Sequence, residues 1–97
     1  MPEIRVSEPE PATLALAGSL VFDTASEALR HIRERMDKGR HDTLSLDGVT
    51  AVDSAGLACV LAIMATARRH GGSLHVTHVP DDLMALARVC EVESLLV

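Results

Sequence analysis

Segments in which apolar and polar residues alternate are separated along this chain by longer segments whose apolar residues recur at helical spacing. The alternating segments are residues 12–17, closed by Gly18, and residues 43–47, and a third apolar segment runs from 73 to 79 before Pro80. Alternation is typical of a half-buried strand, and recurrence every three or four residues is typical of an amphipathic helix. Strands that alternate with helices in this way predict an α/β layer fold.

The first helix is expected to begin at Thr24, because Thr24 and Glu27 have the spacing of a capping box. Gly39 is a typical C-cap and is expected to end it. Its apolar positions recur at helical spacing, and the charged residues between them predict a solvated face. Those apolar positions are Ala25, Leu29, Ile32 and Met36.

The two ends of the chain are less regular. Residues 7–11 are rich in Pro and predict a turn between two short extended segments. Asp81 and Asp82 suit the start of a last helix, and the apolar residues at 93–97 could return to the sheet as a strand. The apolar side of that last helix consists of Leu83, Leu86, Ala87 and Cys90.

Length and composition limit the classes of protein that fit. The 97 residues predict one domain spanning 1–97, and 47% hydrophobic residues are enough for a core. Phe22 is the only aromatic residue and the net charge is -5, so a base-stacking platform and a basic nucleic-acid-binding face are both excluded. There is no signal-peptide pattern, and the longest apolar run, 56–67, is shorter than the roughly 20 residues that span a bilayer. We therefore expect a cytoplasmic protein.

The most informative segment is Asp53-Ser54, which precedes an apolar helix expected to run to about His70. Either side chain can accept hydrogen bonds from the first turn of that helix. The helix start also favours an anion such as a phosphate group, and Gly56 allows another backbone to approach closely. A plain N-cap and a functional site are both consistent with this local chemistry.

The long helix has two apolar faces, which is unusual for a helix on the surface of a small domain. We assign one face to the core: Leu57, Val60, Leu61, Met64 and Ala67. The opposite face consists of small or apolar residues: Ala55, Ala58, Cys59, Ala62, Ile63, Thr66 and Arg69. Another helix of the same domain or a partner protein could cover this second face, and we favour a partner.

These residues resemble the STAS domain, which anti-sigma factor antagonists and sulfate transporters share. The resemblance is carried by Ser45-Leu46-Asp47, by Val52-Asp53-Ser54-Ala55-Gly56-Leu57 and by Gly71-Gly72-Ser73-Leu74, and it covers nearly the whole chain. It implies a mixed β-sheet of four to five strands with helices mainly on one face. Within the family, the segment 18–22 (Gly-Ser-Leu-Val-Phe) and the Ala- and Leu-rich helix are similar to the small cytoplasmic subunit of the Mla phospholipid-transport ABC complex.

The resemblance also implies a role for Ser54. This position is phosphorylated by a partner kinase in anti-sigma factor antagonists, and in Mla subunits it lies at the contact with the ATPase. Antagonists carry a Gly-Glu-Leu-Asp segment, whereas Ser19 and Val21 stand at the two acidic positions here. This departure favours an ATPase-binding subunit that reaches the permease complex and the inner membrane only through its partner. Such a subunit would be involved in outer-membrane lipid asymmetry.

The pattern does not favour an enzyme. The five histidines are scattered, and Ser54 lacks the Gly-x-Ser-x-Gly setting of a nucleophile elbow. Asp47 and Asp53 are too few ligands for a metal site, Cys59 and Cys90 lack metal-site or redox-motif spacing, and no P-loop is present. We expect neither catalysis nor a cofactor. A self-associating scaffold that pairs through the Ala-rich face is a further alternative.

Overall fold

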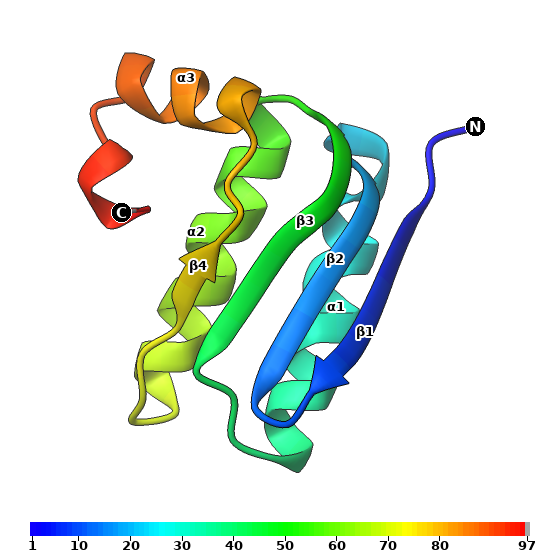
Figure 1. Ribbon diagram of the computed structural model, residues 1–97, viewed down its shortest axis with the longest axis vertical. Coiled ribbons are helices and arrows are strands. Elements are labelled where there is room, and N and C mark those ends of the chain that lie inside the picture. The colour runs from blue at the N-terminus through cyan, green and yellow to red at the C-terminus, as the bar shows by residue number, and fades with distance from the viewer. Residues whose placement is uncertain (97) are drawn as a thin grey trace.

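The computed structural model describes residues 1–96, in which four strands form one sheet. Three α-helices and a short 3-10 helix, η1, complete this part of the chain (Figure 1). The elements are β1 (Ile4–Glu10), β2 (Thr13–Leu20), α1 (Phe22–Lys38), β3 (Thr43–Val52), α2 (Ser54–Arg69), β4 (His75–Thr77), α3 (Asp81–Val89) and η1 (Glu93–Leu95).

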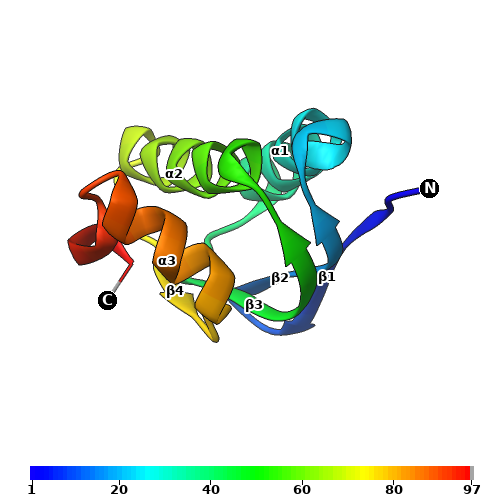
Figure 2. The same cartoon turned by 90° about the horizontal axis from the view of Figure 1, so that it is seen from above.

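The sheet is mixed, with the strand order β1-β2-β3-β4. β1 pairs antiparallel with β2, whereas β2–β3 and β3–β4 are parallel pairs joined through α1 and α2. Both helices cover the same face of the sheet (Figure 2). Because β2 and β3 are parallel, α1 and α2 both begin at one end of the molecule, and α3 lies across that end (Figure 1). The α/β fold with a mixed sheet of four strands and helices mainly on one face confirms the prediction.

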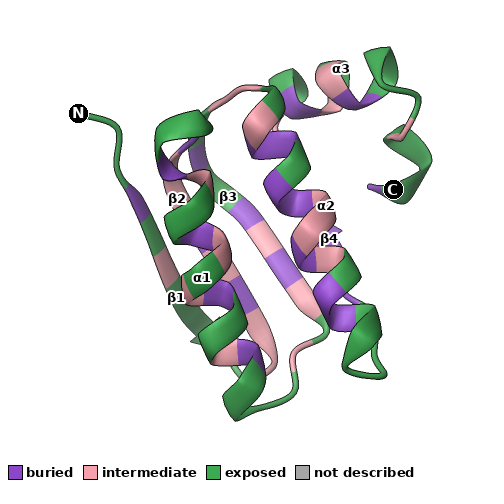
Figure 3. Ribbon diagram, turned by 180° about the vertical axis from the view of Figure 1, so that it is seen from behind, coloured by how far each residue is buried: buried purple, intermediate pink, exposed green. Residues whose placement is uncertain are grey.

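The core lies between the sheet and the inner sides of α1 and α2 (Figure 3). Alternate residues of the central strands point into it, as the alternation of apolar residues predicts. The same spacing principle holds for the helices, whose buried residues recur every three or four positions. Fully buried side chains include Leu14, Leu16, Leu44, Leu46, Ile32, Val60 and Ile63.

Three expected boundaries are wrong, and each has a local cause. β1 continues to Glu10, so the turn is confined to residues 11–12 and Pro9 lies in an edge strand, where its missing N–H costs little. β3 continues through the predicted turn at 48–52 because it pairs with β2 as far as Val52. In the expected return strand at 93–97, residues 93–95 form η1 instead, and Val97 lies outside the described residues.

The start of α1 also differs from the prediction. The helix begins at Phe22 with Val21 at the N-cap, so Thr24 is the third helical residue. The Thr24 hydroxyl accepts a hydrogen bond from the Val21 N–H at 3.1 Å and donates one to the Ser19 carbonyl at 2.6 Å. Thr24 therefore stabilises the helix start from inside the first turn. The predicted end is confirmed, with Gly39 at the C-cap.

Candidate functional site

Asp53 connects the first turns of α1 and α2. One carboxylate oxygen, Oδ1, accepts a hydrogen bond from the backbone N–H of Gly56 at 3.0 Å and so caps α2. The other oxygen, Oδ2, accepts from the backbone N–H of Phe22, the first residue of α1, also at 3.0 Å. Free N–H groups at helix starts need such acceptors. Of the two N-cap candidates, Asp53 and Ser54, Asp53 is therefore the one that caps α2, and it serves two helices at once.

These hydrogen bonds favour the ionised carboxylate. The N–H of Phe22 and then that of Gly56 hold the pKa of Asp53 below its ordinary value of 3.8, against a smaller opposing effect of burial. The starts of both helices add partial positive charge at the same place. Asp53 is therefore an anion already matched to the dipoles of α1 and α2.

Gly56 is the point at which α2 approaches the end of β2. A Cβ at this position would overlap the carbonyl oxygen of Leu20 and lie 3.1 Å from its carbonyl carbon. The expectation that Gly56 permits another backbone to approach closely is confirmed. This contact sets the start of α2 directly against the residues that lead into α1.

The predicted site residues divide into three groups by burial. Ser54, the first residue of α2, is exposed, and so is Ala58 one turn later. Asp53, Ala55 and Ala62 are half-buried, and Gly56, Cys59 and Ile63 are buried. The exposed and half-buried residues leave a surface of small side chains around the Ser54 hydroxyl, beside the ionised carboxylate of Asp53.

The expectation that a partner covers Cys59 and Ile63 is wrong, because α1 of the same chain covers them. The Cys59 thiol donates a hydrogen bond to the Ala25 carbonyl of α1 at 3.4 Å, and burial raises its pKa to about 11. Thr66, further along the same stripe, accepts a hydrogen bond from Arg33 of α1 at 3.3 Å. Ile63 lies between these two contacts and is fully buried. The second apolar face of α2 is thus largely an internal helix–helix contact.

Phe22 is a surface residue that the sequence reasoning did not include in the site. The residue is 78% exposed, although it is the only aromatic residue of the chain. The hydrogen bond to Asp53 joins its backbone to the residue that precedes Ser54. The sequence does mark Phe22, because it is the only aromatic residue and stands at the end of segment 18–22.

The remaining candidates lie apart from this site. Both cysteines are free thiols, Cys59 buried and Cys90 exposed. Among residues 1–96, no group of three or more His, Cys, Asp or Glu side chains is placed to hold a metal ion. A cavity of about 450 Å³ lies at the opposite end of the molecule, near His41 and His70. No helix in this part of the chain is long and apolar enough to cross a membrane.

Solved structures identify the fold class. The unphosphorylated form of the anti-sigma factor antagonist SpoIIAA matches with a TM-score of 0.75 and 13% identity, over 98% of this chain and 86% of that one. The phosphorylated form of the Bacillus cell-fate determinant SpoIIAA gives 0.70 and 13%, over 98% and 89%. A proposed anti-sigma factor antagonist from Thermotoga maritima gives 0.74 and 14%, over 96% and 82%. The chain therefore has the STAS fold.

A family model refines this class. The model described as "Mlab, STAS domain" matches residues 5–97, and the chain belongs to that family. No curated protein sequence matches this chain. STAS domains are protein-interaction domains, and the family is generally one of binding and regulatory modules rather than catalysts.

Proposed function

We propose that this chain is a non-catalytic subunit that binds the cytoplasmic ATPase of an ABC phospholipid transporter involved in outer-membrane lipid asymmetry. The observation that carries the proposal is the exposed Ser54 hydroxyl at the start of α2, surrounded by small residues in a chain that belongs to the Mlab family. Docking would place Ser54, Ala55 and Ala58 against the ATPase, with Asp53 and Gly56 fixing the backbone beneath them. Ala62 would extend the contact along α2.

The mechanism follows from preferential binding. A subunit that binds only the folded or dimerised ATPase stabilises that state by mass action. Small side chains around a neutral hydroxyl allow the partner to approach the start of α2 closely. The effect on the transporter would therefore be stabilisation and regulation, with nucleotide hydrolysis carried out by the partner.

Substitution of Ser54 tests this proposal. In Ser54→Arg, docking would bury a guanidinium group with no partner, which costs several kcal/mol, whereas Ser54→Ala should bind. Ser73→Arg is the matched control, because Ser73 is also exposed but lies between α2 and β4. The measurement is co-purification of each variant with the ABC ATPase and its permease from detergent-solubilised membranes. Equal recovery with Ser54→Arg and Ser73→Arg would contradict the docking surface.

A second function is an anti-sigma factor antagonist that is switched by phosphorylation of Ser54. It is favoured by the similarity to SpoIIAA, for which a phosphorylated form is known, and by the exposure of Ser54. A phosphate group would lie at a helix start, which is favourable, but it would repel a partner fitted to a neutral hydroxyl. Incubation with an anti-sigma kinase, ATP and Mg²⁺ followed by intact mass measurement would detect the phosphate. A mass shift that Ser54→Ala abolishes would support this function over the first.

A further inference from the structure

Phe22 is exposed to an extent that folding alone does not explain. Phe22, the first residue of α1, is 78% exposed. Aromatic side chains usually bury much of their surface, and when exposed they are enriched as anchors of protein–protein interfaces. The other large exposed hydrophobic residues, Met1, Val89 and Leu95, lie in the N-terminal segment, in the last turn of α3 and in η1.

The Phe22 backbone is held firmly beside the Ser54 site. Its N–H donates to Asp53, whose other oxygen caps α2. The preceding residue, Val21, is hydrogen-bonded to Thr24. A side chain whose backbone is already ordered loses less entropy on binding than one on a mobile loop.

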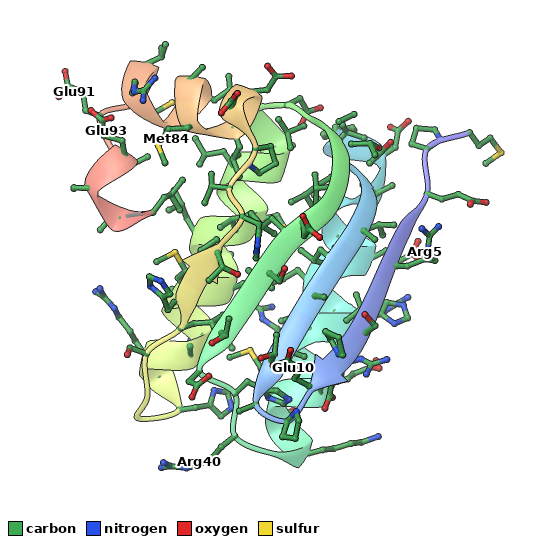
Figure 4. All side chains as sticks on the ribbon, in the orientation of Figure 1. Arg5, Glu10, Arg40, Met84, Glu91 and Glu93 are labelled. Atoms are coloured by element: carbon green, nitrogen blue, oxygen red, sulfur yellow. The ribbon has the colours of Figure 1, made fainter. Side chains whose placement is uncertain are left out.

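The segments that begin the three helices carry charge of one sign, whereas the N-terminal segment, which is hydrogen-bonded to them from the Ser19 N–H to the Glu3 carbonyl at 2.8 Å, contains both Glu3 and Arg5. We define the helix-start end as residues 19–27, 50–58 and 78–85, which contain the first turns of α1, α2 and α3. These segments contain no Lys or Arg, and their acidic residues are Asp23, Glu27, Asp53, Asp81 and Asp82. Arg88, in the last turn of α3, is paired with Glu93 at 3.1 Å. Arg40 lies at the opposite end of the molecule (Figure 4).

An exposed aromatic side chain in an acidic, lysine-free setting fits a partner of complementary charge. We propose that Phe22 is the aromatic anchor of the interface with the ABC ATPase, and that it enters an apolar pocket whose rim is basic. This inference rests on the proposed function and adds the anchoring residue and the charge of the partner surface. Asp23 and Asp82 are both exposed, so their carboxylates can attract a basic partner surface over a distance through solvent.

Affinity for the purified ATPase subunit of an Mla-type transporter from the same organism tests the anchor. Phe22→Ala should raise the Kd at least about tenfold, as loss of a central anchor does, and Phe22→Leu should raise it less. Val89→Ala is the matched control, since Val89 is 83% exposed at the other end of α3 and its truncation should leave the Kd unchanged. Urea unfolding of each variant checks that the fold is retained.

Changes in salt concentration and neutralising substitutions test whether the rim of the partner's pocket is basic. The on-rate should fall as NaCl rises from about 50 mM to about 300 mM, because screening weakens attraction between exposed charges. The double variant Asp23→Asn/Asp82→Asn should lower the on-rate and flatten its salt dependence. An on-rate that is independent of salt would overturn the basic rim.

The outcomes separate this inference from the proposed function. If the wild-type chain does not bind the ATPase, or binds a kinase-type anti-sigma factor instead, both are overturned. If Ser54→Arg abolishes binding and Phe22→Ala binds like wild type, only the anchor is overturned. If both substitutions weaken binding and Val89→Ala does not, the anchor is supported.

Discussion

The carboxylate of Asp53 accepts the backbone N–H of Phe22 at 3.0 Å, across 31 residues of sequence. The same carboxylate caps α2, so one side chain fixes the relative positions of the two helix starts beside Ser54. The residue that the family resemblance suggests as functional is thus held by a neighbour whose role is structural.

Substitution of Asp53 should destabilise the fold in a graded way. Asp53→Asn can still cap α2 through its carbonyl oxygen but has no second acceptor for Phe22, whereas Asp53→Ala loses both bonds. The urea midpoint should therefore fall in the order wild type, Asn, Ala. Asp47→Asn is the control, because Asp47 is exposed in β3. An unchanged midpoint in Asp53→Ala would contradict the bridging role.

The Asp53 bridge also predicts a pH dependence. Because the folded-state pKa lies below 3.8, the stabilisation is present above pH 3.8 and is lost as the pH falls through the folded value. The difference in unfolding free energy between wild type and Asp53→Ala should therefore shrink below about pH 3.8. Urea titrations at a series of acidic pH values would measure it, and a difference that grows on acidification would contradict the assignment.

Gly56→Ala should be strongly destabilising, because the new methyl group would overlap the Leu20 carbonyl. We expect a loss of at least about 1–3 kcal/mol, the usual range for overpacking. Gly72→Ala is the control, since the nearest atom to a Cβ there is the Ala67 carbonyl oxygen at 4.0 Å. Thermal or urea unfolding of both variants gives the comparison. Equal stabilities would show that the end of β2 can shift to accommodate the added methyl group.

Ile63→Ala should cost about 2–5 kcal/mol, as truncation of a fully buried aliphatic side chain does. Ala58→Gln, one turn nearer the start of α2 on its exposed side, should change stability by less than about 0.5 kcal/mol. Urea unfolding measures both. A small effect of Ile63→Ala would contradict the burial of this face of α2 against α1.

The two thiols should differ in reactivity. Cys59 is buried with its pKa raised to about 11, and Cys90 is exposed, so iodoacetamide near neutral pH should modify Cys90 alone. Intact mass should show one adduct on the native protein and two after unfolding in urea. Cys90→Ser should give none in the native state, and rapid modification of that variant would contradict the burial of Cys59.

His70 joins the ends of α1 and α2 and should make stability depend on pH. Its pKa is raised above 6.5 by the Thr66 carbonyl and then by Asp37, whose carboxylate lies 3.2 Å from Nε2. A raised folded-state pKa stabilises below pH 6.5, and that stabilisation is lost as the pH rises through the folded value. The difference in unfolding free energy between wild type and Asp37→Asn should therefore be larger at pH 5.5 than at pH 8.5. An NMR titration of His70 in both proteins would show whether its pKa falls in the variant.

The order of the helices and central strands, and a cap at Asp53 or Ser54, could be predicted because each depends on local pattern, whereas the mixed sheet with helices on one face was implied by the family resemblance. Alternation located the central strands, and Gly39 and the glycines at 71–72 located helix ends. The start of α1 was misplaced because Thr24 has the chemistry of an N-cap but uses it one turn later, from inside the helix.

The errors at the site arise from tertiary packing. The small, apolar second face of α2 is compatible with a partner or with α1, and periodicity alone does not distinguish them. Only the contacts of Cys59 and Thr66 with α1 decide the matter. Likewise, the bond from Phe22 to Asp53 joins residues far apart in sequence, so the exposure of the ring beside Ser54 was not predictable from either segment.

The parallel arrangement of β2 and β3 has a practical consequence for labelling. Both crossover helices begin at one end of the molecule and finish at the other, so the connections at 39–42 and 70–74 are remote from Ser54 and Phe22. A Cβ added at Gly71 would meet nothing within 4 Å. A fluorescent reporter or an affinity tag inserted there would leave the helix starts free. Binding of a partner could then be followed by a label that does not lie on the proposed contact surface.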